Sequence, residues 1–501
     1  MAKLLDENGL AYFWGKVKAA IPTKTSQLTN DSSYITADSP ALTGVPTAPT
    51  AAVGTDSTQI ATTAFVKATV SAAAYPLSIE ITTAPTKTEY KDGEAISISG
   101  MVVKATYSNG TVEDITSACT YSPTTASMAV DAITVTWKWK GIKTYTATQA
   151  ITVKASIYGV YWDGTSTTKF SRTDSAANFA DPVPYVAGAT SYGSPFDNIA
   201  PWSEMTIVDD ATAGKLVKIP KYYYKWAKTG TAMKLQVSSE SFDGALVSPA
   251  HADRGDGTGE RDVVYVGRYH CNSSYKSVTG SSPKVSITRA TARSSISSLG
   301  SAYWQYDYAM YWTIAMLYLV EFGDWNSQAK IGYGCGNGSG PQSVGASDSM
   351  PYHTGTMQSS RTTYGVGTQY RYIEDLWGNV LDWCDGIYFS GSKVYAIKNP
   401  SSFSDSSGGT NIATRPTSSS YISAWSIPTA SGFEYALYPS AVAGSDSTYI
   451  PDCCYYSSSG VVLCVGGSYG QDLYRGLFCL AGGGSASGAG SSIGCRLQKL
   501  P

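Results

Sequence analysis

The stretch Glu374-Asp-Leu-Trp-Gly-Asn-Val-Leu-Asp-Trp383 decides how the C-terminal part of this 501-residue chain folds. Trp377 and Trp383 stand among glycine and apolar residues, a setting in which large aromatic side chains usually pack in a core. Asn379 and Asp382 lie beside them, and buried polar groups are normally hydrogen-bonded. We therefore predict a buried framework segment whose polar side chains tie loops to the core.

Two other parts of the chain combine apolar, glycine and polar residues in a similar way. They are Met316-Leu-Tyr-Leu-Val-Glu-Phe-Gly323 with Asn326-Ser-Gln328, and Val465-Gly-Gly-Ser-Tyr469 with Gly476-Leu-Phe478 and Ile493-Gly-Cys-Arg-Leu497. Arg496 is expected to form buried hydrogen bonds or ion pairs with the framework. Glu321 is a lone carboxylate on a predicted helix, and we interpret it as structural rather than catalytic.

In order and spacing, the three segments together resemble the C-type-lectin-like fold. The resemblance covers roughly the last two hundred residues and implies an α+β domain. This fold is shared by formylglycine-generating enzymes and by the variable proteins of diversity-generating retroelements. Because the two branches differ in function, the residues after the Gly-Gly-Ser motif decide between them.

The enzyme branch carries a pair of copper-binding cysteines shortly after that motif. On this chain the two positions fall at Gln471 and Gly476, and neither residue can supply a thiolate. Cys479 is near, but at a different spacing. The resemblance therefore implies no catalytic residue, no metal site and no cofactor, and we expect that the protein is not an enzyme.

The variable-protein branch ends in a segment in which the retroelement rewrites adenine-containing codons, often those of asparagine, and leaves a framework unchanged. The framework positions are filled here by Gly466, Gly467, Gly476, Leu477, Phe478, Ile493, Gly494 and Arg496. The positions between them, which the resemblance assigns to a ligand-binding face, are Tyr469, Gly470, Gln471, Asp472, Tyr474, Arg475, Ala481, Gly483, Gly484, Gly488, Gly490 and Ser492. Upstream Cys453 and Tyr455 are assigned to the same face. The alternative is a glycine-rich C-terminal loop without variation.

Tyr469, Tyr474 and Arg475 are the expected anchors of that face, because Tyr and Arg are enriched at interface hot spots. The composition of the whole chain agrees with a binding role. It has 37 tyrosines against 11 phenylalanines, and tyrosine, serine and glycine are the residues that binding surfaces favour. The alternative is a β-rich protein with many half-exposed aromatic positions.

Charge and cysteine content exclude several other classes. Charged residues make up 15% and the net charge is -2, so no basic stripe is available for nucleic acid. The nine cysteines are an odd number, which argues against a fully paired disulfide framework, and their spacing resembles no zinc site. The most apolar stretch, 311–322, is shorter than a membrane span and is typical of a buried helix, so no membrane insertion is expected.

Residues 156–501 are predicted to form one α+β domain. This part holds nine of the twelve tryptophans, which indicates a substantial core. Helical periodicity is clear only over 304–321, where Met310, Ile314 and Leu317 share a face with Glu321. Elsewhere glycine- and serine-rich stretches separate short apolar runs, so long loops are expected.

Residues 76–155 show the alternation of β strands. Ser108-Asn-Gly110 is a strong hairpin signal, and Ile133, Val135 and Trp137 mark one face of a later strand. Several short strands over about eighty residues suggest a β-sandwich. The series Tyr90, Gly93-Glu94, Gly100, Val103, Ala105, Tyr107-Ser-Asn-Gly110 and Asp114-Ile-Thr116 resembles bacterial immunoglobulin-like domains, and this domain is expected to be a spacer.

Residues 1–24 are predicted to contain a short amphipathic helix over 4–21, with Leu10, Phe13, Trp14, Val17 and Ile21 on one face. A helix this short is marginal alone, so we expect it to associate with identical copies. Residues 25–75 have the composition of a linker. Within them, the sequence Leu42-Thr-Gly-Val-Pro-Thr-Ala-Pro-Thr50, followed by residues 58–66, resembles a repeat of phage tail fibres. The opening 4–14 resembles the N-termini of phage tail proteins.

These resemblances imply a trimeric phage tail fibre whose C-terminal domain binds a receptor, protein or glycan, on a bacterial host cell. The expected partners are this receptor, tail or baseplate proteins and two further copies, and the expected location is the tip of the fibre on the virion. The absence of a signal peptide agrees with this location. The alternatives are a bacterial surface adhesin and a tail-borne glycan-degrading enzyme, although the latter needs paired carboxylates in a groove.

Overall fold

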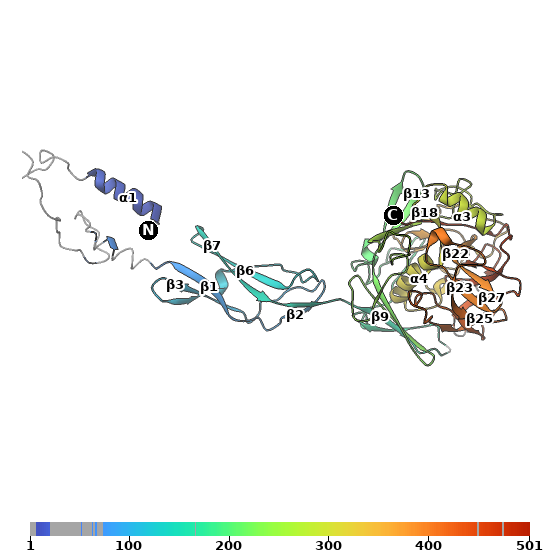
Figure 1. Ribbon diagram of the computed structural model, residues 1–501, viewed down its shortest axis with the longest axis horizontal. Helices are drawn as coiled ribbons and strands as arrows, with labels where there is room; N and C mark the ends of the chain where they lie inside the picture. Colours follow the sequence, from blue (N-terminus) through green and yellow to red (C-terminus); the bar gives the residue numbers. More distant parts are fainter. Residues whose placement is uncertain are drawn as a thin grey trace, which may run out of the picture. The chain divides into compact units, whose positions relative to one another are not determined.

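In the computed structural model, the described residues are 7–20, 52, 63, 66–67, 74–165, 167–447, 450–472 and 475–501. The chain divides into two compact units, Met1–Lys154 and Ala155–Pro501 (Figure 1). Strands predominate, and the described residues form seven sheets and few helices. The chain is thus β-rich and multidomain. Among the described residues, no helix has the length and apolar character needed to cross a bilayer.

In the first unit, the helix expected over 4–21 is present as α1, Glu7–Ala20. Residues 4–6 and Ile21 lie outside the described residues. Tyr12 and Phe13 on α1 are exposed. Of the expected fibre segment 25–75, only positions 52, 63, 66–67 and 74–75 are described, so the prediction of a fibre repeat falls almost wholly outside them.

The rest of the first unit consists of two three-stranded sheets and a short parallel pair. The sheets are β1-β3-β4 and β5-β6-β7, and the pair is β2-β8. The strands are β1 (Pro76–Thr83), β2 (Glu89–Lys91), β3 (Val102–Tyr107), β4 (Val112–Asp114), β5 (Thr120–Ser122), β6 (Ala132–Trp139), β7 (Lys143–Ala150) and β8 (Thr152–Lys154). The predicted hairpin is confirmed, because β3 and β4 pair antiparallel around a turn in which Gly110 has φ 85°.

The two three-stranded sheets share one core. Val103 and Ala105 of β3 pack in one cluster with Val135 and Trp137 of β6. The alternation predicted from the sequence is confirmed, because the intervening Lys104 is exposed. The Tyr145 hydroxyl of β7 donates a hydrogen bond to the Pro76 carbonyl of β1 at 2.6 Å and so links the sheets.

The second unit is built on four sheets, of five, four, five and nine strands. The five-stranded sheets are β10-β9-β15-β14-β16 and β12-β13-β17-β31-β18, and the four-stranded sheet is β11-β19-β20-β21. The strands of these three are β9 (Tyr158–Trp162), β10 (Ser171–Asp174), β11 (Tyr185–Val186), β12 (Thr206–Asp210), β13 (Gly214–Pro220), β14 (Tyr223–Thr229), β15 (Ala232–Ser238), β16 (Leu246–Val247), β17 (Val263–Gly267), β18 (Tyr303–Gln305), β19 (Gly355–Thr356), β20 (Thr368–Tyr370), β21 (Ile373–Glu374) and β31 (Leu497–Lys499).

The nine-stranded sheet carries the segment of interest. Its order is β24-β23-β22-β28-β29-β27-β25-β26, with β30 paired to β22. The strands are β22 (Leu381–Ser390), β23 (Lys393–Ala396), β24 (Thr410–Thr414), β25 (Ser420–Ser426), β26 (Tyr438–Val442), β27 (Ile450–Tyr456), β28 (Val462–Val465), β29 (Leu480–Gly484) and β30 (Ile493–Gly494).

A helix that is buried on every side, α4 (Tyr308–Phe322), forms the centre of the second unit (Figure 1). The Asp307 side chain accepts a hydrogen bond from Met310 N at its start, and Gly323 ends it in the left-handed conformation. The prediction of a buried helix over 311–322 is confirmed. The helical range 304–321 was wrong at its start, because Trp304 lies in β18 and the capping Asp307 interrupts the pattern.

Two shorter helices, α3 (Arg289–Ser297) and α5 (Ser327–Lys330), lie outside the periodicity recognised in the sequence. Tryptophans dominate the core, as their number predicts. Fully buried are Trp162, Trp202, Trp312, Trp325, Trp377, Trp383 and Trp425.

Candidate ligand-binding surface

Most of the predicted ligand-binding residues lie on β29, in the connection before it or in the loop after it, near the middle of the nine-stranded sheet, and Cys453 and Tyr455 lie on β27. β28 and β29 are antiparallel neighbours, with Val465 opposite Leu480. Residues 466–479 connect them. β27 runs parallel to β29 on its other side, with Tyr455 opposite Ala481. The structure therefore brings the upstream Tyr455 beside the C-terminal segment.

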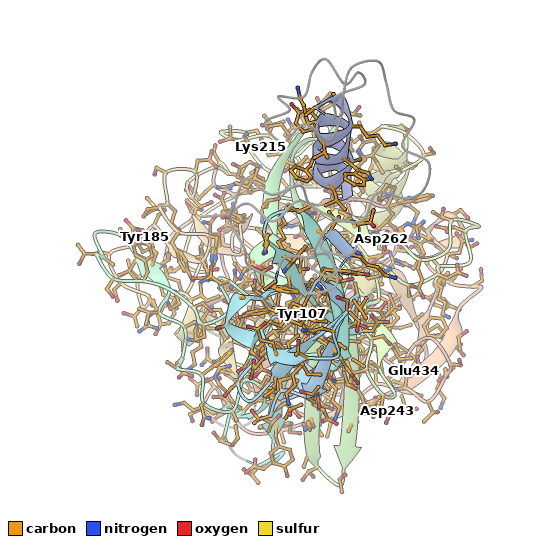
Figure 2. All side chains as sticks on the ribbon, turned by 90° about the vertical axis from the view of Figure 1, so that its left-hand side faces the viewer. Tyr107, Tyr185, Lys215, Asp243, Asp262 and Glu434 are labelled. Atoms are coloured by element: carbon orange, nitrogen blue, oxygen red, sulfur yellow. The ribbon has the colours of Figure 1, made fainter. Side chains whose placement is uncertain are left out.

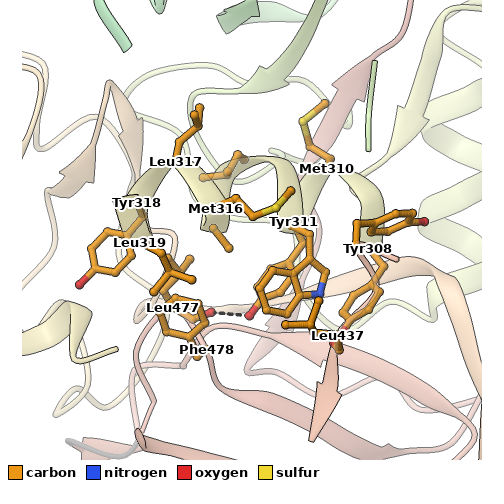
Figure 3. Close-up of a cluster of buried hydrophobic side chains, with 14 of the residues drawn as sticks. Tyr308, Met310, Tyr311, Met316, Leu317, Tyr318, Leu319, Leu437, Leu477 and Phe478 are labelled. Carbon is orange, nitrogen blue, oxygen red and sulfur yellow. Dashed lines mark hydrogen bonds between the residues drawn. The ribbon is translucent and has the colours of Figure 1, made fainter. Parts of the chain in front are cut away.

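The end of the 466–479 connection is fixed to the buried helix α4. Leu477 and Phe478 are fully buried beneath this helix (Figure 3), and the Tyr311 hydroxyl donates to the Leu477 carbonyl at 3.1 Å. Leu477 N donates to Ser327 Oγ at 2.9 Å. Tyr311 and Ser327 thus hold the end of this connection by two hydrogen bonds.

A buried carboxylate holds the same stretch from the side of β27. Asp452 accepts hydrogen bonds from Gly476 N and from Phe478 N, the latter at 2.9 Å. Burial raises the pKa of Asp452 to about 7, although the two backbone N–H groups act in the opposite direction. This role of Asp452 was not predicted from the sequence.

The start of the connection is fixed by the framework residues predicted from the sequence. Tyr469 N donates to the Asn379 carbonyl at 2.9 Å. The Asn379 side chain exchanges hydrogen bonds with the backbone of Gln342, at 2.9 and 3.0 Å. Asn379 thereby joins three loops, which confirms its predicted role.

Arg496 and Asp382 are also confirmed as buried framework residues. Arg496 Nε donates to Asp382 Oδ2 at 3.1 Å. The two terminal nitrogens of Arg496 reach four backbone carbonyls, those of Gly267, Arg268, Glu374 and Asp375, at 2.9 to 3.1 Å. Asp382 also contacts His270 Nδ1 at 3.0 Å, and its pKa is lowered by His270 and Arg496 against the effect of burial.

Trp377, Trp383 and Glu321 have the structural roles that the sequence predicted. The indole nitrogens of Trp377 and Trp383 donate to the carbonyls of Gly332 and Ile287 at 2.9 and 2.8 Å. Glu321 is fully buried and forms a bidentate ion pair with Arg371, whose Nε and Nη2 donate to the carboxylate at 3.0 and 2.6 Å.

The glycines of the segment fall into two groups when a Cβ is added to each. At the framework glycines there is no room for it. The nearest atoms would be Leu376 O at 2.6 Å from Gly466, Arg475 O at 2.6 Å from Gly467, Ser327 Oγ at 2.5 Å from Gly476, and Lys284 O at 2.8 Å from Gly494. Real Cβ contacts are essentially never closer than 3.0 Å, so these four positions require glycine.

Most glycines assigned to the ligand-binding face have space for an added Cβ. Nothing lies within 4 Å of an added Cβ at Gly470, and the nearest atoms at Gly483 and Gly490 are at 3.5 and 3.4 Å. Gly484 and Gly488 are tighter, at 3.2 and 3.0 Å. The positions that the resemblance separated into framework and face therefore also differ in steric freedom.

The larger side chains of the face form two groups. The Arg475 guanidinium lies 4.0 Å from the centre of the Tyr455 ring, and Ala481 is opposite Tyr455. The Tyr469 hydroxyl approaches Ser491 Oγ at 3.4 Å, which links the connection to the loop that precedes β30. Gln471 Oε1 accepts from Ser468 N within the connection itself.

Burial agrees with a surface role for most of these residues. Gly470, Asp472 and Gly483 are exposed, and the others are partly exposed apart from two. Cys453 is buried, with 8% of its surface exposed, because its strand β27 turns it inward beside Cys479. Tyr474 lies outside the described residues. All nine cysteines are free thiols.

A second loop contributes to the surface and was missed in the sequence. Gln471 N and Asp472 N both donate to the Gly336 carbonyl at 2.9 Å, and Gly338 N donates to the Tyr469 carbonyl. The glycine-rich run Gly334-Cys-Gly-Asn-Gly-Ser-Gly340 is the signal that indicates such a close approach of two backbones.

Comparison with known proteins gives a structural likeness but no match in sequence. No protein-family model matches the sequence, and no curated protein matches it. Among solved structures, the chain is similar to one titled "Major Tropism Determinant I1 Variant", with 11% identity over 77% of this chain and 84% of that chain and a TM-score of 0.24.

Proposed function

We propose that this chain is the receptor-binding protein of a phage tail fibre, and that the face around β28 and β29 binds the host receptor. One observation carries the proposal. The framework glycines of the segment have no space for a side chain, whereas Gly470, Gly483 and Gly490 on the proposed face do. A scaffold that presents exchangeable residues needs this separation, because a change of side chain must alter the surface without disturbing the core.

The anchoring of the segment supports the same proposal. Leu477, Phe478 and Arg496 are held by buried contacts, while Tyr469 and Arg475 take no part in the core. A rigid support limits the entropy lost on binding, and large side chains such as Tyr and Arg contribute most of the energy at hot spots. The serines and glycines around them would shape the surface and contribute little energy.

The remaining parts of the proposal concern the assembly. The C-terminal unit would be a C-type-lectin-like domain without catalytic activity, and residues 76–155 an immunoglobulin-like spacer. The helix α1, with exposed Tyr12 and Phe13, would associate with two further copies and attach the fibre to tail proteins. Three faces on one fibre, located at the tip on the virion, would bind a cell firmly by effective concentration even if each face binds weakly.

Binding of the purified chain to candidate host cells tests the proposal. We compare the wild type with the double variant Tyr469→Ala and Arg475→Ala. The matched control is Tyr161→Ala, which removes a tyrosine that is 41% exposed on β9. We expect the control to bind like the wild type and the double variant to bind at least about tenfold more weakly. Equal binding by all three, with intact circular dichroism, would show that this face is not the receptor site.

A further inference from the structure

The C-terminal unit has a cavity that shares no residue with the proposed receptor-binding face. Its volume is about 330 Å³. One wall is apolar and consists of Ala245, Leu246, Val247, Pro249 and Ala252. β16 contributes Leu246 and Val247 to this wall, and the rest of the lining comes from β14, Lys398 and the segments 252–260 and 431–435. A space of this size accommodates a small molecule or one long side chain of another protein.

Three buried polar side chains line the cavity. Tyr224, Tyr435 and Arg254 are 2%, 6% and 3% exposed. Within the described part of the chain, neither tyrosine hydroxyl forms a hydrogen bond. Burial raises the pKa of both tyrosines; Glu434 adds to the increase in each, and Arg254 opposes it at Tyr435. Glu434 lines the same cavity as the two tyrosines.

The charges around the cavity are predominantly negative. Asp253, Glu260 and Glu434 contribute carboxylates, and Lys398 contributes an ammonium group. The remaining charged residue, Arg254, is neutralised by Asp307, because Arg254 Nη2 donates to the buried Asp307 Oδ2 at 2.9 Å.

Of the three carboxylates that line the cavity, Glu434 has the fewest hydrogen bonds and ion pairs. Near the periphery of the C-terminal unit (Figure 2), it forms no ion pair with any described residue. Glu260, by comparison, lies 3.8 Å from Lys221, and Asp253 accepts a hydrogen bond from Gly255 N at 2.8 Å. A ligand group that enters the cavity therefore meets one uncommitted negative charge beside two tyrosine hydroxyl oxygens that can accept hydrogen bonds.

We propose that this cavity binds a primary amine carried on a short apolar stem, such as the side chain of a lysine residue. The ammonium group would donate to the Glu434 carboxylate and to a tyrosine oxygen, while the stem would pack against Leu246 and Val247. An ammonium group has three hydrogen-bond donors and no acceptor, which suits the carboxylate and the tyrosine oxygens. Burial of the apolar stem against the apolar wall would also be favourable.

An anionic ligand is the main alternative, and one atom favours it. Arg254 Nη1 is buried and has no hydrogen-bond partner among the described residues. The other two nitrogens of Arg254 donate hydrogen bonds to the Lys398 carbonyl and to the Asp307 carboxylate. A carboxylate that reached Arg254 Nη1 would also have to approach the negative charge of Glu434. We therefore expect an anionic ligand to bind more weakly than the amine.

Titration of the full chain with three probes of equal stem length tests the inference. The probes are n-butylammonium, n-butanol and butyrate, and binding is followed by the NMR signals of the probe. We expect a dissociation constant on the order of 1 mM for n-butylammonium, and values at least about tenfold higher for the other two. The inference is overturned if butyrate binds best or if butanol binds as well as the amine.

Two glutamate variants place the binding in this cavity. Glu434→Gln removes the charge and keeps the shape, and we expect it to weaken n-butylammonium about fivefold, as for a partly exposed ion pair. Glu204→Gln is the matched control, because Glu204 is exposed and does not line the cavity. Equal affinity in both variants would overturn the assignment. Because Tyr469 and Arg475 are unchanged in these variants, the outcome is independent of receptor binding.

Discussion

Gly467→Ala should destabilise the folded chain and Gly470→Ala should not, although the two residues lie three positions apart in the same loop. At Gly467 the added Cβ would lie 2.6 Å from the Arg475 carbonyl oxygen and 2.7 Å from the Arg475 Cβ. Ordinary contact begins at 3.4 Å, so the two ends of the loop must move apart by about 0.8 Å, the difference between 3.4 and 2.6 Å. Overpacking of this kind costs about 1–3 kcal/mol.

At Gly470 the same methyl group meets nothing within 4 Å, and the backbone there does not have the positive φ that would disfavour alanine. Replacing glycine by alanine at such a position reduces the conformational freedom of the unfolded chain. We therefore expect Gly470→Ala to be neutral or to stabilise by up to about 1 kcal/mol.

Urea unfolding followed by tryptophan fluorescence measures both changes. The signal comes mainly from the second unit, because nine of the twelve tryptophans lie there. Gly467→Ala should lower the urea midpoint, and Gly470→Ala should leave it unchanged or raise it. If Gly470→Ala costs as much as Gly467→Ala, steric room does not separate framework from face, and the observation on which the proposed function rests is lost.

Three further changes test the framework. Arg496→Lys should destabilise by about 3–5 kcal/mol, because lysine cannot replace the contacts of the guanidinium with four backbone carbonyls and Asp382; thermal unfolding measures the loss, and a change under about 1 kcal/mol would contradict it. The pKa of Asp452 is about 7 in the folded chain against an ordinary 3.8, so the folded chain holds this proton more tightly. Its contribution to stability therefore falls as the pH rises from about 4 to about 7; urea midpoints at pH 5 and pH 8 should differ less in Asp452→Asn than in the wild type, and an unchanged difference would refute the assignment. Ser327→Ala should cost about 1–3 kcal/mol by leaving Leu477 N without its partner, and differential scanning calorimetry with Ser359→Ala as an exposed control would show it.

The framework was predictable because its signals are local. The apolar and glycine neighbours of Trp377 and Trp383 indicate that both side chains are buried. Asn379 and Asp382 are polar residues within an apolar run. Arg496 has the residue type that buried, multiply bonded positions favour. The division of the C-terminal segment into framework and face rested on a resemblance, and the steric differences among its glycines were not visible in the sequence.

Features that depend on distant contacts were not predictable. The helix α3 has a serine-rich sequence, and it is held by Arg289, whose guanidinium donates to the carbonyls of Cys384 and Ile387 at 2.9 and 2.6 Å. The inward orientation of Cys453 depends on the pairing of β27 with β29. The start of α4 was misplaced because Trp304, in β18, happens to continue the helical period.

The placement of β31 has a consequence for how such a surface can be altered. This strand, Leu497–Lys499, lies between β17 and β18 in the interior of its sheet, and it follows the proposed face in the sequence. Any insertion or deletion that shifts the reading frame within residues 469–492 also replaces these residues and splits the sheet in two. A substitution within residues 469–492 leaves the sequence of β31 in place.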